Sequence, residues 1–138
     1  MLRPFHYAFL VLDLDATRRF YGDLLGCREG RSSDTWVDFD LFGNQLSAHV
    51  APAIPEPAGI GHVDGIEVPV PHFGAILAWD EFDRVARALQ DADVPFLISP
   101  RVRYPGQPGE QATLFVRDPS GNPIELKAFR YPAQVFTE

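Results

Sequence analysis

The sequence predicts one α+β domain over residues 1–138, made of two modules that each contain a strand, a helix and three further strands. Three observations predict this fold class. Runs with strand periodicity alternate with two amphipathic helical stretches, the order of elements repeats along the chain, and a proline-rich segment separates the repeats. A chain of 138 residues is long enough for one compact core. We therefore expect modules at about residues 1–51 and 72–130, joined by a connector over 52–71.

The first module is expected to begin with a strand that leads into a helix. Asp13 ends an apolar run and is a residue type that caps helices, whereas Gly26 is typical of the position after a last helical turn. Further on, apolar and polar residues alternate on either side of a Gly43-Asn44 turn. The predicted elements are a strand over 5–12, a helix over 14–25, an extended segment from 27–30, and strands over 35–42 and 45–51. The apolar stripe of the helix comprises Thr17, Phe20, Tyr21 and Leu24.

The second module repeats this order after a connector that contains five of the 13 prolines and three glycines. Such a segment is not expected to form a long regular element. The predicted elements are a strand over 72–78, a helix over 80–92, and strands over 94–99, 111–117 and 123–129. A long loop is expected over 101–110, and Asp118 to Asn122 form a strong tight-turn signature.

Composition argues against several classes of function. The 12 basic and 19 acidic residues leave a formal net charge of −7, which disfavours nucleic acids and anionic membrane surfaces because both attract clustered positive charge. Cys27 is the only cysteine, so neither an intrachain disulfide nor a cysteine-based zinc cluster is expected. The apolar run over 7–12 is far shorter than the ~20 residues of a membrane span. These features predict a soluble, cytoplasmic protein.

Strand alternation assigns polar side chains to faces of the predicted sheets. In the last strand the apolar residues suit packing on a helix, which leaves Glu125 and Lys127 on the opposite face. The same parity turns His6 in the first strand, and His72 at the start of the fifth, away from the helices. Two histidines and one glutamate are the ligand set of a facial metal triad.

Four segments carry the motifs of a known family. They are Asp-Leu-Asp at 13–15, Arg-Phe-Tyr-Gly-Asp-Leu-Leu-Gly at 19–26, Pro-His-Phe-Gly at 71–74, and Asp-Pro-Ser-Gly-Asn-Pro-Ile-Glu-Leu at 118–126. In these segments the chain resembles the vicinal oxygen chelate superfamily, which includes glyoxalases, bleomycin resistance proteins and extradiol dioxygenases. The resemblance implies paired βαβββ modules that form a cup-shaped mixed sheet with helices on its outer face. It also implies a divalent metal held by His6, His72 and Glu125.

Within this family, the residue at the fourth ligand position separates the candidate reactions. Alignment of the two Gly-Asn turns pairs Glu125 with Ser47, a poor metal ligand, whereas glyoxalase I enzymes resemble one another in having a fourth ligand there. A three-ligand site with open positions favours Fe(II), with Mn(II), Zn(II) or Ni(II) as alternatives. By resemblance to the extradiol dioxygenases, His49 on the face of Ser47 is the candidate catalytic base.

Five residues besides the ligands are candidates for contact with a substrate on the basis of side-chain type. Trp36 and Phe115 lie on the same faces as the ligands and would form an apolar wall, or else ordinary core. Arg103 and Tyr104 lie on the predicted loop over 101–110 and would close the pocket, or else shape a surface turn.

Lys127, the only lysine in the chain, shares the face of Glu125 in the last predicted strand. Its ammonium group would bind a carboxylate of a substrate. A salt bridge with Asp38 or Asp40 is the alternative.

These observations predict a metal-dependent enzyme that acts on a small molecule with vicinal oxygens, most closely an extradiol, ring-cleaving dioxygenase. A lyase or isomerase of the glyoxalase type is the alternative enzyme. A metal-free resistance protein that sequesters a drug is the alternative from another class. A homodimer is expected, because edge strands pair readily and members of the superfamily often dimerise.

Overall fold

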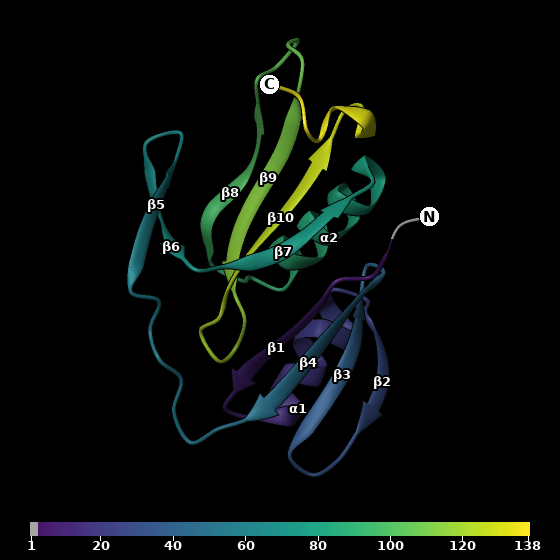
Figure 1. Cartoon of the computed structure of the whole chain (residues 1–138), viewed down its shortest axis with the longest axis vertical. Helices are drawn as coiled ribbons and strands as arrows, with labels where there is room; N and C mark the ends of the chain where they lie inside the picture. Colours follow the sequence, from purple (N-terminus) through teal and green to yellow (C-terminus); the bar gives the residue numbers. More distant parts are fainter. Residues whose placement is uncertain (1–2) are drawn as a thin grey trace. The chain divides into compact units, whose positions relative to one another are not determined.

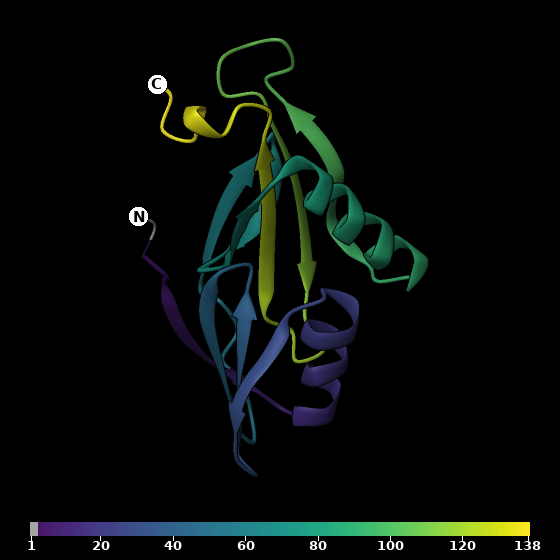
Figure 2. The same cartoon turned by 90° about the vertical axis from the view of Figure 1, so that its right-hand side faces the viewer.

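The computed structural model describes residues 3–138, so the first two residues of the predicted first module lie outside the described residues. The described residues form two compact units, whose elements are labelled in Figure 1 and turned by 90° in Figure 2. One unit contains residues 3–56 and the loop Asp118–Asn122, and the other contains Pro57–Arg117 and Pro123–Glu138. None of the helices within residues 3–138 is long and apolar enough to cross a membrane. The mixed α+β fold class is confirmed.

The first unit is a βαβββ module with one four-stranded sheet in the order β1-β4-β3-β2. β1 and β4 are parallel, and the other neighbours are antiparallel. The elements are β1 (His6–Val11), α1 (Leu14–Arg18), η1 (Arg19–Leu24), β2 (Arg28–Ser32), β3 (Trp36–Leu41) and β4 (Asn44–Val50). The predicted alternation is confirmed, because Val37, Phe39 and Leu41 are buried on the helix side of β3.

The first helix differs from the prediction in its winding. Asp13 caps its N-terminus by accepting a hydrogen bond from the Ala16 amide. After Arg18 the chain continues as a π-helical segment, in which a turn takes up an additional residue. As a consequence, Leu25 is fully buried, whereas the predicted stripe residue Leu24 is only half-buried.

The loop Asp118–Asn122 is attached to the first unit by one buried hydrogen bond and is closed by two more within the loop. Tyr21 donates its hydroxyl hydrogen to Asp118 Oδ2 at 2.8 Å, and the amides of Ser120 and Asn122 donate to Oδ1. Burial raises the pKa of the Asp118 carboxyl above its usual value, and these hydrogen bonds oppose the shift. Burial, with the charge of Asp118 adding to it, also raises the pKa of Tyr21 well above its usual value. The tight turn predicted at this loop is confirmed.

The second unit repeats the βαβββ order in a four-stranded sheet, β7-β10-β9-β8. β7 and β10 are parallel, and the other neighbours are antiparallel. The elements are β7 (Phe73–Leu77), α2 (Trp79–Asp91), β8 (Phe96–Arg103), β9 (Gln111–Arg117), β10 (Pro123–Phe129) and the 3₁₀ turn η2 (Pro132–Gln134). The α2 helix packs on β9 and β10 through an apolar stripe of Phe82, Val85, Ala86 and Leu89.

The prediction for β8 was too short. The strand continues through Arg103 instead of ending at Ser99. Pro100 lies at a register shift of this edge strand, where a missing amide donor is tolerated. The predicted loop over 101–110 therefore begins only at Tyr104, which has a φ of 54°.

The connector contains a hairpin that the sequence pattern did not predict. It consists of β5 (Gly59–Val63) and β6 (Ile66–Val70), joined by a turn at Asp64-Gly65. Both turn residues have positive φ, 50° and 79°, as tight hairpin turns require. Val68 of the hairpin is buried in an apolar cluster of the second unit. This tertiary contact stabilises a short hairpin whose proline and glycine content favours a loop.

Strand registers confirm the internal duplication. Ser47 in β4 pairs with the residue two positions after His6 in β1. Glu125 in β10 pairs with the residue two positions after His72 in β7. The two modules are therefore equivalent residue by residue at these strands, as the alignment of the Gly-Asn turns predicted.

Candidate metal centre

Two contacts set the orientation of the ring of His72, a residue in the short segment of chain that links β6 to β7. Its Nδ1 is 2.7 Å from the Pro69 carbonyl oxygen, and because a carbonyl can only accept, Nδ1 is the donor. The ring packs edge-on against Phe115, with centroids 4.8 Å apart. In the neutral imidazole, Nε2 is left with a free lone pair, which is the form in which histidine binds metals.

The two carboxylate oxygens of Glu125 have different neighbours. The residue is 9% exposed, and the Thr113 hydroxyl donates to its Oε2 at 2.6 Å. Its Oε1 lies 3.4 Å from His72 Nε2 and 3.7 Å from the ammonium of Lys127. Lys127 therefore pairs with the glutamate on its own strand.

The facing atoms of His72 and Glu125 suit a shared cation. With the proton on Nδ1, lone pairs of Nε2 and Oε1 face each other at 3.4 Å, which a positive ion bound to both stabilises. Two ligand atoms that are each about 2.1 Å from one metal are about 3.0 Å apart at a right angle and about 3.4 Å apart at the tetrahedral angle. The donor pair therefore fits a divalent metal. Among residues 3–138, no three His, Cys, Asp or Glu side chains gather into a metal-binding group, so this pair would supply two of the three predicted ligands.

Gly74 keeps β7 close to β10 beside this pair. A Cβ atom at this position would overlap the backbone carbonyl oxygen of Glu125. Only a glycine permits such an approach between the strand that follows His72 and the strand that carries Glu125.

In the first unit, the sheet carries the third predicted ligand on a polar face. His6 in β1 pairs in register with Gln45 in β4, so both lie on the face opposite the buried Leu46. Ser47 lies on this polar face, and its hydroxyl donates to Asp38 Oδ1 at 2.6 Å. The duplication aligns Ser47 with Glu125, the predicted glutamate ligand. A carboxylate, that of Asp38 on the neighbouring strand, therefore lies beside Ser47.

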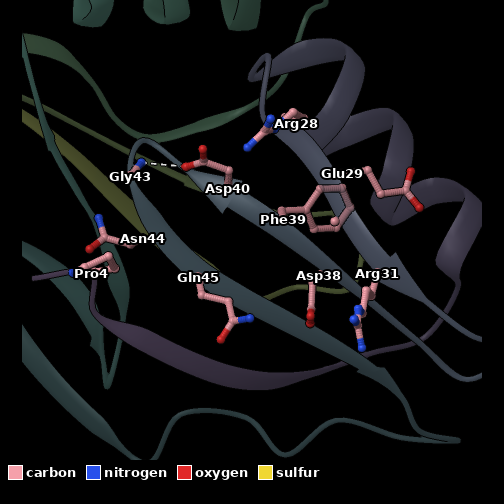
Figure 3. Close-up of a pocket in the computed structure, with 11 residues that line it drawn as sticks. Pro4, Arg28, Glu29, Arg31, Asp38, Phe39, Asp40, Gly43, Asn44 and Gln45 are labelled. Atoms are coloured by element: carbon pink, nitrogen blue, oxygen red, sulfur yellow. Dashed lines mark hydrogen bonds between the residues drawn. The ribbon is translucent and has the colours of Figure 1, made fainter.

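A cavity of about 510 Å³ opens beside this polar face (Figure 3). Its walls carry charges of both signs, because Arg28 and Arg31 of β2 lie next to Asp38 and Asp40 of β3. The Asp40 carboxylate also accepts a hydrogen bond from the Gly43 amide at 2.7 Å. The cavity offers donors and acceptors to a small polar ligand.

His49 and Trp36 are neighbours on the same polar face. They form a cross-strand pair of β4 and β3 with ring centroids 6.4 Å apart. His49 is exposed and Trp36 is half-buried, so the imidazole is accessible to water and to a ligand.

The other predicted substrate contacts have partners within the second unit. Arg103 Nε lies 3.2 Å from Asp64 at the hairpin tip, and its terminal nitrogen donates to the Tyr104 hydroxyl at 3.0 Å. Arg101 Nε lies 3.3 Å from the other oxygen of Asp64. Phe115 is fully buried. The ion pairs attach the hairpin tip to β8. The substrate roles of Arg103, Tyr104 and Phe115 stay predictions.

Three residues that shape the centre were absent from the sequence-based roles. The sequence contained a signal for Thr113, because alternation along β9 places it beside Lys127 on the sheet face that carries Glu125. Gly74 had one as well, because a glycine inside a strand indicates a close backbone approach. The sequence contained no signal for Pro69, because this residue contacts His72 through its backbone carbonyl.

The sequence matches a protein family over most of its length. A model of the Glyoxalase/Bleomycin resistance protein/Dioxygenase superfamily matches residues 3–126. No curated protein matches the sequence.

Solved structures are similar over almost the whole chain. A glyoxalase/bleomycin resistance protein/dioxygenase from Alicyclobacillus acidocaldarius is 27% identical, with a TM-score of 0.75, covering 97% of this chain and 96% of its own. A fosfomycin resistance protein from Listeria monocytogenes is 18% identical, with a TM-score of 0.70, covering 98% of this chain and 100% of its own. A glyoxalase/dioxygenase from Nostoc punctiforme is 21% identical, with a TM-score of 0.69, covering 94% and 92%. The last two support the fold alone.

Proposed function

Because the chain belongs to the Glyoxalase/Bleomycin resistance protein/Dioxygenase superfamily, we propose that it is a metal-dependent enzyme acting on a small molecule with two vicinal oxygens. Within that class we propose a ring-cleaving dioxygenase of the extradiol type. The observation that carries the proposal is the 3.4 Å separation of His72 Nε2 and Glu125 Oε1, with the second nitrogen and the second oxygen already hydrogen-bonded. Outer contacts of this kind orient metal ligands.

The proposed ligands are His6, His72 and Glu125, and the proposed metal is Fe(II), with Mn(II), Zn(II) or Ni(II) as alternatives. His6 would come from the same chain or from a second copy in a homodimer. When bound, the metal would supply Lewis-acid activation of the two vicinal oxygens. Three protein ligands would leave positions free for both oxygens of the substrate. The proposed location is the cytoplasm.

The remaining proposed roles concern the substrate. The exposed imidazole of His49 is the proposed base, and Trp36 beside it would contact an aromatic ring. Phe115 would act indirectly, because it is fully buried and supports the ring of a proposed metal ligand. Arg103 and Tyr104 remain proposed contacts of the substrate.

Metal binding by anaerobically purified protein tests the centre itself. Glu125→Gln removes a ligand oxygen and is expected to lower Fe(II) content and Zn(II) affinity at least about tenfold. Glu110→Gln is the matched control, because the Glu110 carboxylate pairs with Arg130 at 2.9 Å instead of facing a histidine. It should bind metal like the unchanged protein. The proposal is overturned if the unchanged protein binds no more metal than Glu125→Gln.

Oxygen uptake with a panel of catechols then tests the reaction. We expect uptake by the Fe(II)-loaded protein and none by Glu125→Gln. Isomerisation of the methylglyoxal–glutathione adduct without oxygen uptake would contradict the dioxygenase and support the glyoxalase-type lyase. Tight binding of bleomycin that a chelator leaves unchanged, measured by calorimetry, would contradict both enzymes and support a sequestering protein.

A further inference from the structure

The charge balance at Glu125 depends on Lys127, two residues further along β10. The Thr113 hydroxyl binds Oε2 of the carboxylate, while Oε1 lies between His72 and the Lys127 ammonium. The Glu125 side chain is 10% exposed and that of Lys127 33% exposed. In the structure, the ammonium is therefore a counter-ion of the oxygen that faces the proposed metal position.

Three arginines of this unit are paired with other groups. Arg101 and Arg103 share the carboxylate of Asp64 at the hairpin tip. Arg130 pairs with Glu110, and its guanidinium lies 3.7 Å from the centroid of the Trp79 ring.

The strand neighbours of Lys127 offer it no second negative charge. Across the sheet it pairs with Ile76 on β7 and Thr113 on β9, both uncharged. Within the described residues, Glu125 is the acidic side chain at ion-pair distance from the ammonium. A divalent ion bound to Oε1 would replace Lys127 as the counter-ion of that oxygen. Two neutral imidazoles, one carboxylate and one divalent ion would then carry one net positive charge, to which Lys127 adds a second.

We propose that Lys127 determines specificity by binding an anionic oxygen of the metal-chelating substrate, a carboxylate or an ionised catechol oxygen. This role rests on the proposed metal centre. A neutral chelating group would leave the two positive charges uncompensated, whereas an anionic oxygen binds both the metal and the ammonium. Lys127 therefore has opposite effects on the two binding steps: it competes with the metal for Glu125, and it assists the anion that binds afterwards.

The test uses Zn(II), which binds without redox turnover, and measures affinities by calorimetry and absorbance. The probes are oxalate, which supplies carboxylates, 4-nitrocatechol, which supplies a catecholate, and imidazole, which is neutral. The variants are Lys127→Gln, Lys127→Arg, and Arg101→Gln as the control that removes a positive charge of the same unit next to Asp64.

For Lys127→Gln we expect about tenfold tighter Zn(II) binding, an effect limited by the partial exposure of Lys127. We also expect at least about tenfold weaker binding of an anionic probe to the Zn(II)-loaded protein. The affinity for imidazole should be unchanged. Lys127→Arg should restore the affinity for the anion, and Arg101→Gln should change neither step. A loss confined to oxalate assigns a carboxylate, and a loss confined to 4-nitrocatechol assigns a catecholate.

Unchanged affinities for both anions in Lys127→Gln, or an equal loss for imidazole, would overturn the role of Lys127 while leaving the metal centre in place. If the unchanged protein fails to bind Zn(II) or Fe(II), the metal centre itself fails, and the role of Lys127 falls with it.

Discussion

Replacement of Thr113 by valine tests whether the contact behind Glu125 supports the metal centre. Thr113 is fully buried, and its hydroxyl donates to Glu125 Oε2 at 2.6 Å. Valine has nearly the same shape, so packing is retained while the donor is lost. A buried carboxylate oxygen is then left without that partner.

The structure sets the expected magnitude. A hydrogen bond to a charged group contributes about 1.5 to 3 kcal/mol, and the near-complete burial of Glu125 favours the upper half of that range, about 2.5 kcal/mol. For 138 residues the unfolding entropy is about 0.3 kcal/mol/K. The Tm of the metal-free protein should therefore fall by about 8 °C. Zn(II) affinity should fall about 10- to 100-fold, as is typical when an outer contact of a ligand is removed.

Thermal unfolding and Zn(II) calorimetry measure the two effects. Thr17→Val is the matched control, because Thr17 is also buried but donates to the Asp13 carbonyl in the first unit. It should lower Tm by a smaller amount and leave Zn(II) affinity unchanged. A change of 1 kcal/mol corresponds to roughly 3 °C in Tm for a chain of this length. The proposed support of Glu125 by Thr113 is refuted if the Tm of Thr113→Val lies within about 2 °C of that of the unchanged protein and its Zn(II) affinity is the same.

Two further substitutions test contacts elsewhere in the two units. Tyr21→Phe removes the buried hydrogen bond to Asp118 and should cost about 2 kcal/mol in unfolding free energy. It should also raise the pKa of Asp118 further, because one of the bonds that oppose the effect of burial is lost; an unchanged carboxyl titration by NMR would contradict this. Gly74→Ala places a Cβ on the Glu125 carbonyl and should cost more than about 3 kcal/mol and weaken Zn(II) binding. Gly43→Ala is its control, because no atom lies within 4 Å of a Cβ at that position and the only cost is that of its positive φ, about 1 kcal/mol. Similar losses of unfolding free energy in both variants would show that crowding at β10 is unimportant.

Periodicity predicted most of the regular structure because it is a local property. β9 and β10 begin and end at the predicted residues, since strict alternation and the Asp118–Asn122 turn mark both ends. The hairpin β5–β6 was missed because its prolines and glycines indicate a loop. Its stability comes from Val68 packing in a distant cluster and from Asp64 binding arginines of β8. Neither contact leaves a local signal.

For the candidate centre, the sequence by itself determined which side chains share a strand face. Glu125 and Lys127 are two residues apart, and the period of a strand sends both the same way. Tertiary structure decided which atoms meet: Pro69 holds one nitrogen of His72, and Thr113 holds one oxygen of Glu125. The first contact spans three residues and depends on how the backbone turns between β6 and β7, whereas the second joins β9 to β10. The geometry of the second depends on strand register, which the packing of the whole sheet selects.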